Sequence, residues 1–121
     1  MSAGDTAVSW HVELAVEPGA LETLRALTEQ MVEATREEQG VLHYERHVSP
    51  DGATVHVYER YVDSAAAAAH LRAFAQKFGD RFAGLVQRRR FTVYGEPSAE
   101  LKRMLGRYGA VYFAPFGGFT R

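Results

Sequence analysis

Segments in which apolar residues recur at every second position alternate with segments in which they recur at helical spacing. The order of these segments is the feature that most constrains the fold of this chain. From Val8 to Glu17 apolar and polar residues alternate, and a period of two predicts a strand with one buried face. Pro18-Gly19 ends this segment, and Pro18 suits the first position of a helix. Apolar residues then recur at helical spacing as far as Ala34, which predicts an amphipathic helix.

Two more alternating segments follow Gly40, which is expected to end the helix as a left-handed cap. Residues 41–48 and 54–62 predict a pair of strands, because both are rich in β-branched and aromatic residues. The SPDGA sequence between them predicts a turn, in which Gly52 supplies the positive φ. The order up to this point is therefore strand, helix, strand, strand.

A second helix is predicted from its cap, Asp63 or Ser64, to about Lys77. Its five consecutive alanines have the highest helix propensity, and their small size lets the helix lie close to a sheet. A short helical piece over 80–87 and a fourth strand over 89–96 follow. The resulting βαββαβ order predicts an α+β fold of the ferredoxin-like type.

A C-terminal extension is expected beyond this core. Residues 97–108 predict a further helix, and residues 110–121 form a tail rich in aromatic residues and glycine. So dense an apolar stretch is expected to be covered, by the body of the protein or by a partner subunit, or to close one end of a pocket as a lid. We expect one domain over 1–121, with its core at about 7–96 and the extension at 97–121.

The composition excludes several classes of protein. A net charge of −1 argues against a nucleic-acid surface as the main function, and the absence of cysteine excludes disulfides and thiolate metal sites. No segment approaches the roughly 18 apolar residues of a membrane span. The N-terminal MSAGDTAVSW lacks the basic and apolar regions of a signal peptide. We therefore expect a cytoplasmic protein that binds neither nucleic acid nor membrane.

One face of the predicted sheet is polar and rich in histidine. Alternation places on it His11, Glu13, His43, Glu45, His47, His56, Tyr58, Arg60, Thr92 and Tyr94. The opposite face, expected to pack under the helices, consists of Trp10, Val12, Leu14, Leu42, Tyr44, Val55, Val57, Phe91 and Val93. A shift of the SPDGA hairpin by one residue would exchange the two faces there.

The polar face has two interpretations of similar weight. Either it meets the same face of a second chain, with its polar groups paired across the interface, or it lines a ligand pocket beside that partner. On the second interpretation the ligand-binding residues are His11, His43, His56, Tyr58 and Arg60. A metal site is a weaker third interpretation, because no short metal-binding spacing connects its candidate ligands His11, His43, His56 and Glu45. We therefore assign no metal ligand.

Three stretches resemble the antibiotic biosynthesis monooxygenase (ABM) family: LAVEPGALETL, REEQGVLHYERHV and VYERYVDSAAAAAH. The first is similar to the family's strand-Pro-Gly-helix opening. The second resembles the family's acidic helix end, which a glycine separates from a strand that contains a tyrosine. The third resembles the family's strand with a glutamate and an aromatic residue, followed by a capped helix that contains a histidine. The resemblance extends over 7–96 and implies a dimeric α/β barrel, and therefore a homodimer formed through the sheet.

The same resemblance implies a function. An ABM-like protein is expected to bind a small aromatic or quinol-like molecule and to oxygenate it as a cofactor-independent monooxygenase. Glu59, Tyr61 and His70 occupy the family's positions and are the catalytic candidates, with His70 suited to acid–base work near neutral pH. The haem-degrading branch has an Asn-Trp-His constellation, whereas this chain has no asparagine and its only tryptophan is Trp10. No cofactor is therefore expected.

A second function class stays open. A non-enzymatic small-ligand-binding or structural dimer of the same fold would use His70 as a buried structural histidine, bonded to a backbone carbonyl or to Glu59. Whichever class is right, His70 shares a helical stripe with Ala66, Ala67 and Phe74, and this stripe is expected to face the sheet.

Overall fold

The computed structural model describes residues 6–121; residues 1–5, the start of the N-terminal segment for which no signal peptide is expected, lie outside the described residues. Within residues 6–121 no helix has the length and apolar character that crossing a membrane requires. The elements, in chain order, are β1 (Val8–Val16), α1 (Leu21–Arg36), β2 (Val41–Val48), β3 (Thr54–Tyr61), α2 (Ser64–Lys77), α3 (Gly79–Ala83), β4 (Val86–Tyr94), α4 (Ala99–Leu105), the 3-10 turn η1 (Gly106–Tyr108) and β5 (Val111–Phe113).

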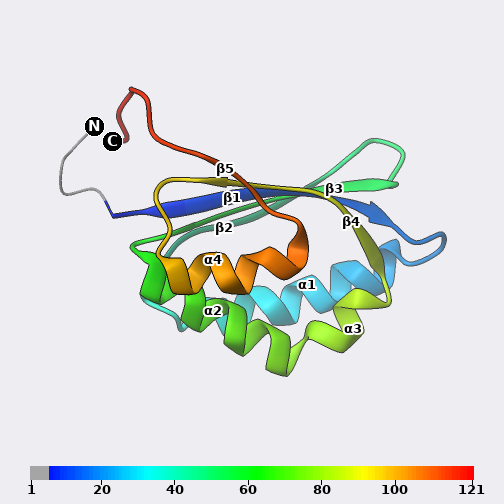
Figure 1. Cartoon of the computed structure of the whole chain (residues 1–121). Helices are drawn as coiled ribbons and strands as arrows, with labels where there is room; N and C mark the ends of the chain where they lie inside the picture. The colour runs from blue at the N-terminus through cyan, green and yellow to red at the C-terminus, as the bar shows by residue number, and fades with distance from the viewer. Residues whose placement is uncertain (1–5) are drawn as a thin grey trace.

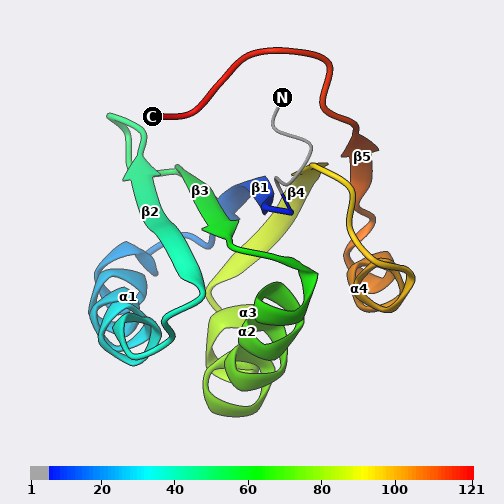
Figure 2. The same ribbon diagram turned by 90° about the vertical axis from the view of Figure 1, so that its left-hand side faces the viewer.

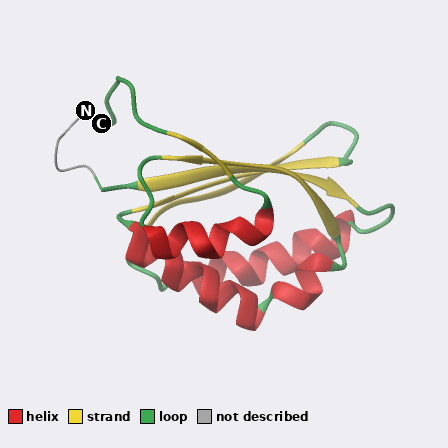
Figure 3. Ribbon diagram, viewed as in Figure 1, coloured by secondary structure: helices red, strands yellow, loops and turns green. Residues whose placement is uncertain are grey.

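The strands form one sheet in the order β2-β3-β1-β4-β5, as expected for a ferredoxin-like α+β fold with an added edge strand. The helices cover one face of this sheet, which we call the inner face (Figures 1 and 3). The core lies between them and includes the nearly inaccessible side chains of Trp10, Leu14, Met31, Tyr61 and Val93. The opposite, outer face carries no helix, and within one chain the sheet is open and not closed into a barrel (Figure 2).

The connections around α1 differ in detail from the sequence-based expectation. Pro18 does not open the helix; Gly19 has a φ of 78°, a turn forms, and α1 begins at Leu21. Gly40 does not have the expected positive φ, so its prediction as a left-handed cap is wrong. Its small size is required instead, because a Cβ built on Gly40 would lie 2.6 Å from the Cβ of Ala66 on α2.

We expect Gly40→Ala to lower the free energy of unfolding by about 1–3 kcal/mol, because overpacking forces the α2 backbone to shift. Urea denaturation monitored by circular dichroism measures this change. Gly106→Ala is the matched control, since Gly106 has helical dihedral angles and a Cβ there meets nothing within 4 Å. Equal stability of the two variants would show that the approach of α2 to Gly40 is not tight.

The β2-β3 hairpin has the register that keeps the outer face polar. His43, Glu45 and His47 of β2 pair with Arg60, Tyr58 and His56 of β3, and Gly52 has the expected positive φ, 73°. The prediction for Leu42 is wrong, however. The register shifts between Val41 and His43, and Leu42 at this irregularity is half exposed instead of packing under the helices.

The fourth strand begins at Val86, earlier than the expected residue 89, and the short helix α3 ends at Ala83. The pairing of β1 with β4 also contains a β-bulge. Glu13 lies opposite Arg90 while Leu14 lies opposite Arg88, so one residue of β4 is left without a partner. The bulge places Arg88 on the inner face, which simple alternation could not foresee.

The C-terminal extension also differs from expectation. The predicted helix is shorter and continues as the 3-10 turn, and β5 pairs in parallel with β4 as an unforeseen edge strand. Beyond β5 the tail arches over the outer face (Figure 2). Phe116 and Phe119 are 105% and 80% exposed, so the body of the same chain does not cover them. The tail also lies on the opposite side of the sheet from the helices and is no lid for an inner pocket.

Candidate functional site

Helix α2 positions His70 against the inner face of the sheet. The Asp63 side chain caps the helix by accepting a hydrogen bond of 2.8 Å from the Ala66 amide. The alanine side of the helix then faces the sheet, with Ala67, Ala68 and Leu71 buried. His70 is 3% exposed, so it lies in the interior as the stripe predicted.

Below the sheet, Glu59 of β3 is the centre of a buried polar network. Its Oε1 accepts hydrogen bonds from Trp10 Nε1 at 2.9 Å and from the Tyr61 hydroxyl at 2.5 Å. Its Oε2 accepts a hydrogen bond of 2.5 Å from the Arg46 guanidinium. All three donors are themselves wholly or largely buried, so the network depends on every member being satisfied.

The electrostatics of this network fix the protonation of its acids. Burial by itself would raise the pKa of Glu59, but the charge of Arg46, the charge of His70 and the bond from Tyr61 together hold that pKa below its ordinary value. Burial and the neighbouring Glu59 carboxylate raise the pKa of Tyr61 well above its ordinary value. Glu59 is therefore an ionised acceptor and Tyr61 a protonated donor at neutral pH.

His70 lies between two carboxylates. Its Nδ1 is 3.0 Å from Oε1 of Glu38, which follows the end of α1, and its Nε2 is 3.8 Å from Oε1 of Glu59. An ionised carboxylate only accepts hydrogen bonds, so the Nδ1–H of His70 donates to Glu38. The sequence did not identify Glu38 as a partner of His70, although Glu38 lies in REEQG, the acidic end of the first helix.

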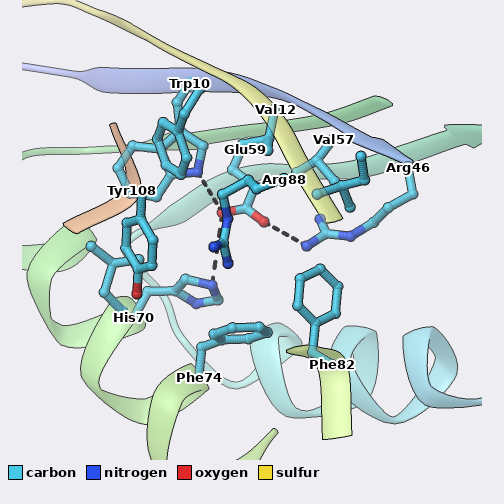
Figure 4. Close-up of a pocket in the computed structure, with 13 residues that line it drawn as sticks. Trp10, Val12, Arg46, Val57, Glu59, His70, Phe74, Phe82, Arg88 and Tyr108 are labelled. Carbon is cyan, nitrogen blue, oxygen red and sulfur yellow. Dashed lines mark hydrogen bonds and ion pairs between the residues drawn. The ribbon is translucent and has the colours of Figure 1, made fainter. Parts of the chain in front are cut away.

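A cavity adjoins this network on the inner face (Figure 4). It has a volume of about 50 Å³, and Glu59, His70 and Arg46 lie in its wall beside apolar side chains such as Phe74 and Phe82. A second cavity of about 140 Å³ adjoins the first and shares four wall residues with it, namely Leu14, Arg46, Val57 and Phe82. A hydrophobic lining with a few convergent polar groups is typical of small-molecule sites.

Two further residues of the first cavity come from parts of the chain that the sequence did not connect with a site. Arg88 reaches it through the β4 bulge, and its guanidinium carbon lies 4.4 Å from the ring centroid of Tyr108. Tyr108, from the C-terminal extension, stacks on Phe91 with ring centroids 5.6 Å apart and planes 6° apart. The extension therefore contributes to the wall of the inner cavity, while the tail beyond it does not.

The predicted ligand-binding residues lie on the other side of the sheet. His11 and His56 contact each other at a centroid distance of 4.6 Å, and His43 lies 5.6 Å from Tyr58. Arg60 shares this outer face through its pairing with Ser9 and His43. The sheet separates these five residues from Glu59, Tyr61 and His70, so the two groups cannot contact the same part of one ligand.

The outer face does not assemble a metal-binding group. Among residues 6–121 no three side chains of the ligating types are placed to hold a metal ion. Burial and repulsion from His56 lower the pKa of His11, against the opposing effect of Glu13. This crowding of imidazoles is consistent with a face that meets another surface.

The fold and the site define an α+β protein of ferredoxin-like topology with a charged network at the wall of an inner cavity. The chain belongs to the antibiotic biosynthesis monooxygenase family, whose model matches residues 7–77, more than half of the chain. No sequence among curated proteins matches it.

Solved structures support the same fold. MupZ from Pseudomonas fluorescens superimposes with a TM-score of 0.85 and 24% identity, over 96% of this chain and 95% of that chain. Protein SO0527 from Shewanella oneidensis superimposes with a TM-score of 0.61 and 28% identity, over 74% of this chain and 88% of that chain. SnoaB, a cofactor-independent oxygenase from Streptomyces nogalater, superimposes with a TM-score of 0.65 and 11% identity, over 78% of this chain and 96% of that chain. The MupZ match is long enough to include much of the C-terminal extension.

Proposed function

We propose that the protein is a cofactor-independent monooxygenase that acts on a small aromatic molecule of the phenol or hydroquinone type. The observation that carries this proposal is the position of His70, which is buried at the cavity wall with Nδ1 held by Glu38. Because Nδ1–H donates to Glu38, Nε2 is the ring nitrogen that can accept a proton from a bound hydroxyl group.

The proposed reaction uses the substrate as its own reductant. His70 removes the phenolic proton, the resulting anion passes electrons to O2, one oxygen atom enters the ring, and the other leaves as water. A phenol and O2 thus yield a quinone and water. Arg46 and Arg88 supply positive charge beside the developing anion, where the low dielectric strengthens its effect. Glu59 and Tyr61 hold Arg46 and the cavity wall in place.

Support for this activity comes from membership of the family and from the likeness to SnoaB, which is a cofactor-independent oxygenase. The test is oxygen uptake by the wild-type protein, treated with a chelator, in the presence of substituted hydroquinones. Uptake above spontaneous autoxidation, with one atom of ¹⁸O₂ in the product, supports the proposal. Uptake no faster than with heat-denatured protein would count against it.

The second candidate is a non-enzymatic ligand-binding or structural dimer. The observation in its favour is that every oxygen of Glu59 is already bonded within the protein, and that the first cavity has room for only a few waters. Saturable binding of the same hydroquinones without oxygen uptake would favour this second candidate.

We further propose that the chain forms a homodimer through the outer face, as a single ABM-like domain in each subunit. The motive is the exposed apolar surface of the β4-β5 edge and the tail, which includes Tyr94, Val111, Phe113, Phe116 and Phe119. Monomeric proteins rarely leave so much apolar surface in contact with water. A second subunit beneath the arching tail would cover it.

Sedimentation equilibrium is expected to give the mass of a dimer at micromolar concentration. Replacing Phe116 and Phe119 together by serine should raise the dissociation constant at least tenfold, because aromatic side chains dominate interface energies. A wild-type protein that sediments as a monomer at these concentrations would refute the dimer.

A further inference from the structure

The charges around the first cavity do not balance. Its wall contains two arginines, Arg46 and Arg88, but only one carboxylate, that of Glu59. Arg46 donates to Glu59 through one terminal nitrogen, while its other terminal nitrogen, Nη1, is buried and has no hydrogen-bond partner. Among residues 6–121 no carboxylate lies within salt-bridge distance of Arg88, whose recorded contact is the Tyr108 ring.

The buried Nη1 of Arg46 is unfavourable in this state, because it has lost hydration and gained no hydrogen bond. The side chain of Arg88 is exposed, so its charge stands in contact with solvent at the edge of the cavity. Burial lowers the pKa of Arg88, and Tyr108 opposes this effect. An arginine nevertheless stays protonated in proteins, so deprotonation cannot remove the charge. His70 aside, the two arginines of the cavity wall therefore outnumber its carboxylate by one, and one buried donor is unused.

The second cavity supplies a different environment on the far side of Arg46. Six of its eleven wall residues are aliphatic, and its polar residues besides Arg46 are Arg25, Thr28 and His47. Its volume of about 140 Å³ is close to the roughly 150 Å³ of an apolar cavity known to bind benzene. Because the two cavities share wall residues, one ligand can place a charged end in the first and an apolar body in the second.

We propose that the ligand of this site is a small carboxylic acid with an apolar body about the size of one benzene ring. Its carboxylate binds between the Arg88 guanidinium and the free Nη1 of Arg46, and its ring occupies the second cavity (Figure 4). A planar carboxylate matches the fork of an arginine, and a single negative charge balances the single excess positive charge. A dianionic phosphate would leave the site with an excess of negative charge.

This inference rests on the proposed function in one respect, that the inner cavities form the ligand site. It narrows the substrate class to aromatic acids, of which 2,5-dihydroxyphenylacetate is also a hydroquinone. Binding and oxygen uptake are separate measurements. Binding of carboxylates without oxygen uptake would refute the monooxygenase activity and leave this inference intact. Oxygen uptake with neutral hydroquinones, without binding of acids, would support the monooxygenase activity and refute this inference.

The test is a comparison of phenylacetate with its neutral isostere phenylacetamide, followed by the fluorescence of Trp10, the single tryptophan of the chain and a residue of the cavity wall. Phenylacetate should bind at least tenfold more tightly than phenylacetamide. Arg88→Gln should remove most of this preference. Arg89→Gln is the matched control, since it removes the same charge from a neighbouring residue that lines neither cavity, and it should change the affinity less than twofold.

Equal binding of the amide and the acid would overturn the inference, and so would an unchanged preference in Arg88→Gln. Tighter binding of phenyl phosphate than of phenylacetate would show that the site prefers a dianion and would also overturn it. The inference would also be overturned if phenylacetate did not bind at millimolar concentration. Thermal unfolding of each variant verifies that the fold is retained, and Arg88→Lys, which keeps the charge, should recover part of the preference.

Discussion

Glu59→Ala is expected to lower the free energy of unfolding by about 3–5 kcal/mol, as when one partner of a buried ion pair is removed. The substitution leaves the Arg46 cation, the Trp10 N–H and the Tyr61 hydroxyl buried without their shared acceptor. Urea denaturation at neutral pH measures the loss. Glu45→Ala on the exposed outer face is the control and should change stability by no more than about 0.5 kcal/mol.

Two further measurements separate the network from a general packing effect. A double variant, Arg46→Met with Glu59→Leu, should recover much of the stability, because no uncompensated charge is then left in the interior. Since the folded pKa of Glu59 lies below its ordinary value, its contribution is complete above the unfolded pKa of 4.5 and is lost as the pH falls through the folded pKa. Identical acid unfolding of wild type and double variant would argue against this role.

His70→Gln is expected to lower turnover by about 10²–10⁴-fold while retaining much of the stability, because glutamine can still donate to Glu38 but cannot act as a base at neutral pH. His70→Ala should in addition cost about 1–3 kcal/mol, since it leaves a gap in the interior and the partly buried Glu38 carboxylate loses its partner. Oxygen uptake and urea denaturation of the same preparations measure the two effects.

The matched control is His56→Gln, which changes a histidine that is half exposed on the outer face and lines neither inner cavity. It should leave both turnover and stability unchanged. Turnover that survives in His70→Gln would assign the proton transfer to another group and leave His70 as a structural residue. Glu38→Gln should lower turnover with a shifted pH profile, because Glu38 acts only through the orientation of the imidazole.

Much of the fold follows from the sequence alone, because local patterns decide it. The alternation in β1, β2 and β3 separates a polar face from an apolar one. The cap at Asp63 and the alanine stripe bring His70 under the sheet. Even Arg46 could have been placed on the inner face, because it is two residues from Tyr44 on the same strand.

The site itself was decided by the tertiary structure. Glu38 and His70 are 32 residues apart and meet because α1 and α2 pack on the same face. Arg88 enters the cavity because a bulge in β4 reverses the alternation, and a bulge depends on how two strands pair. The edge strand β5 and the contribution of Tyr108 depend likewise on where the C-terminal extension docks. Local periodicity fixes which face a side chain takes within its own element, whereas the meeting of separate elements sets the charges and the shape of the cavity.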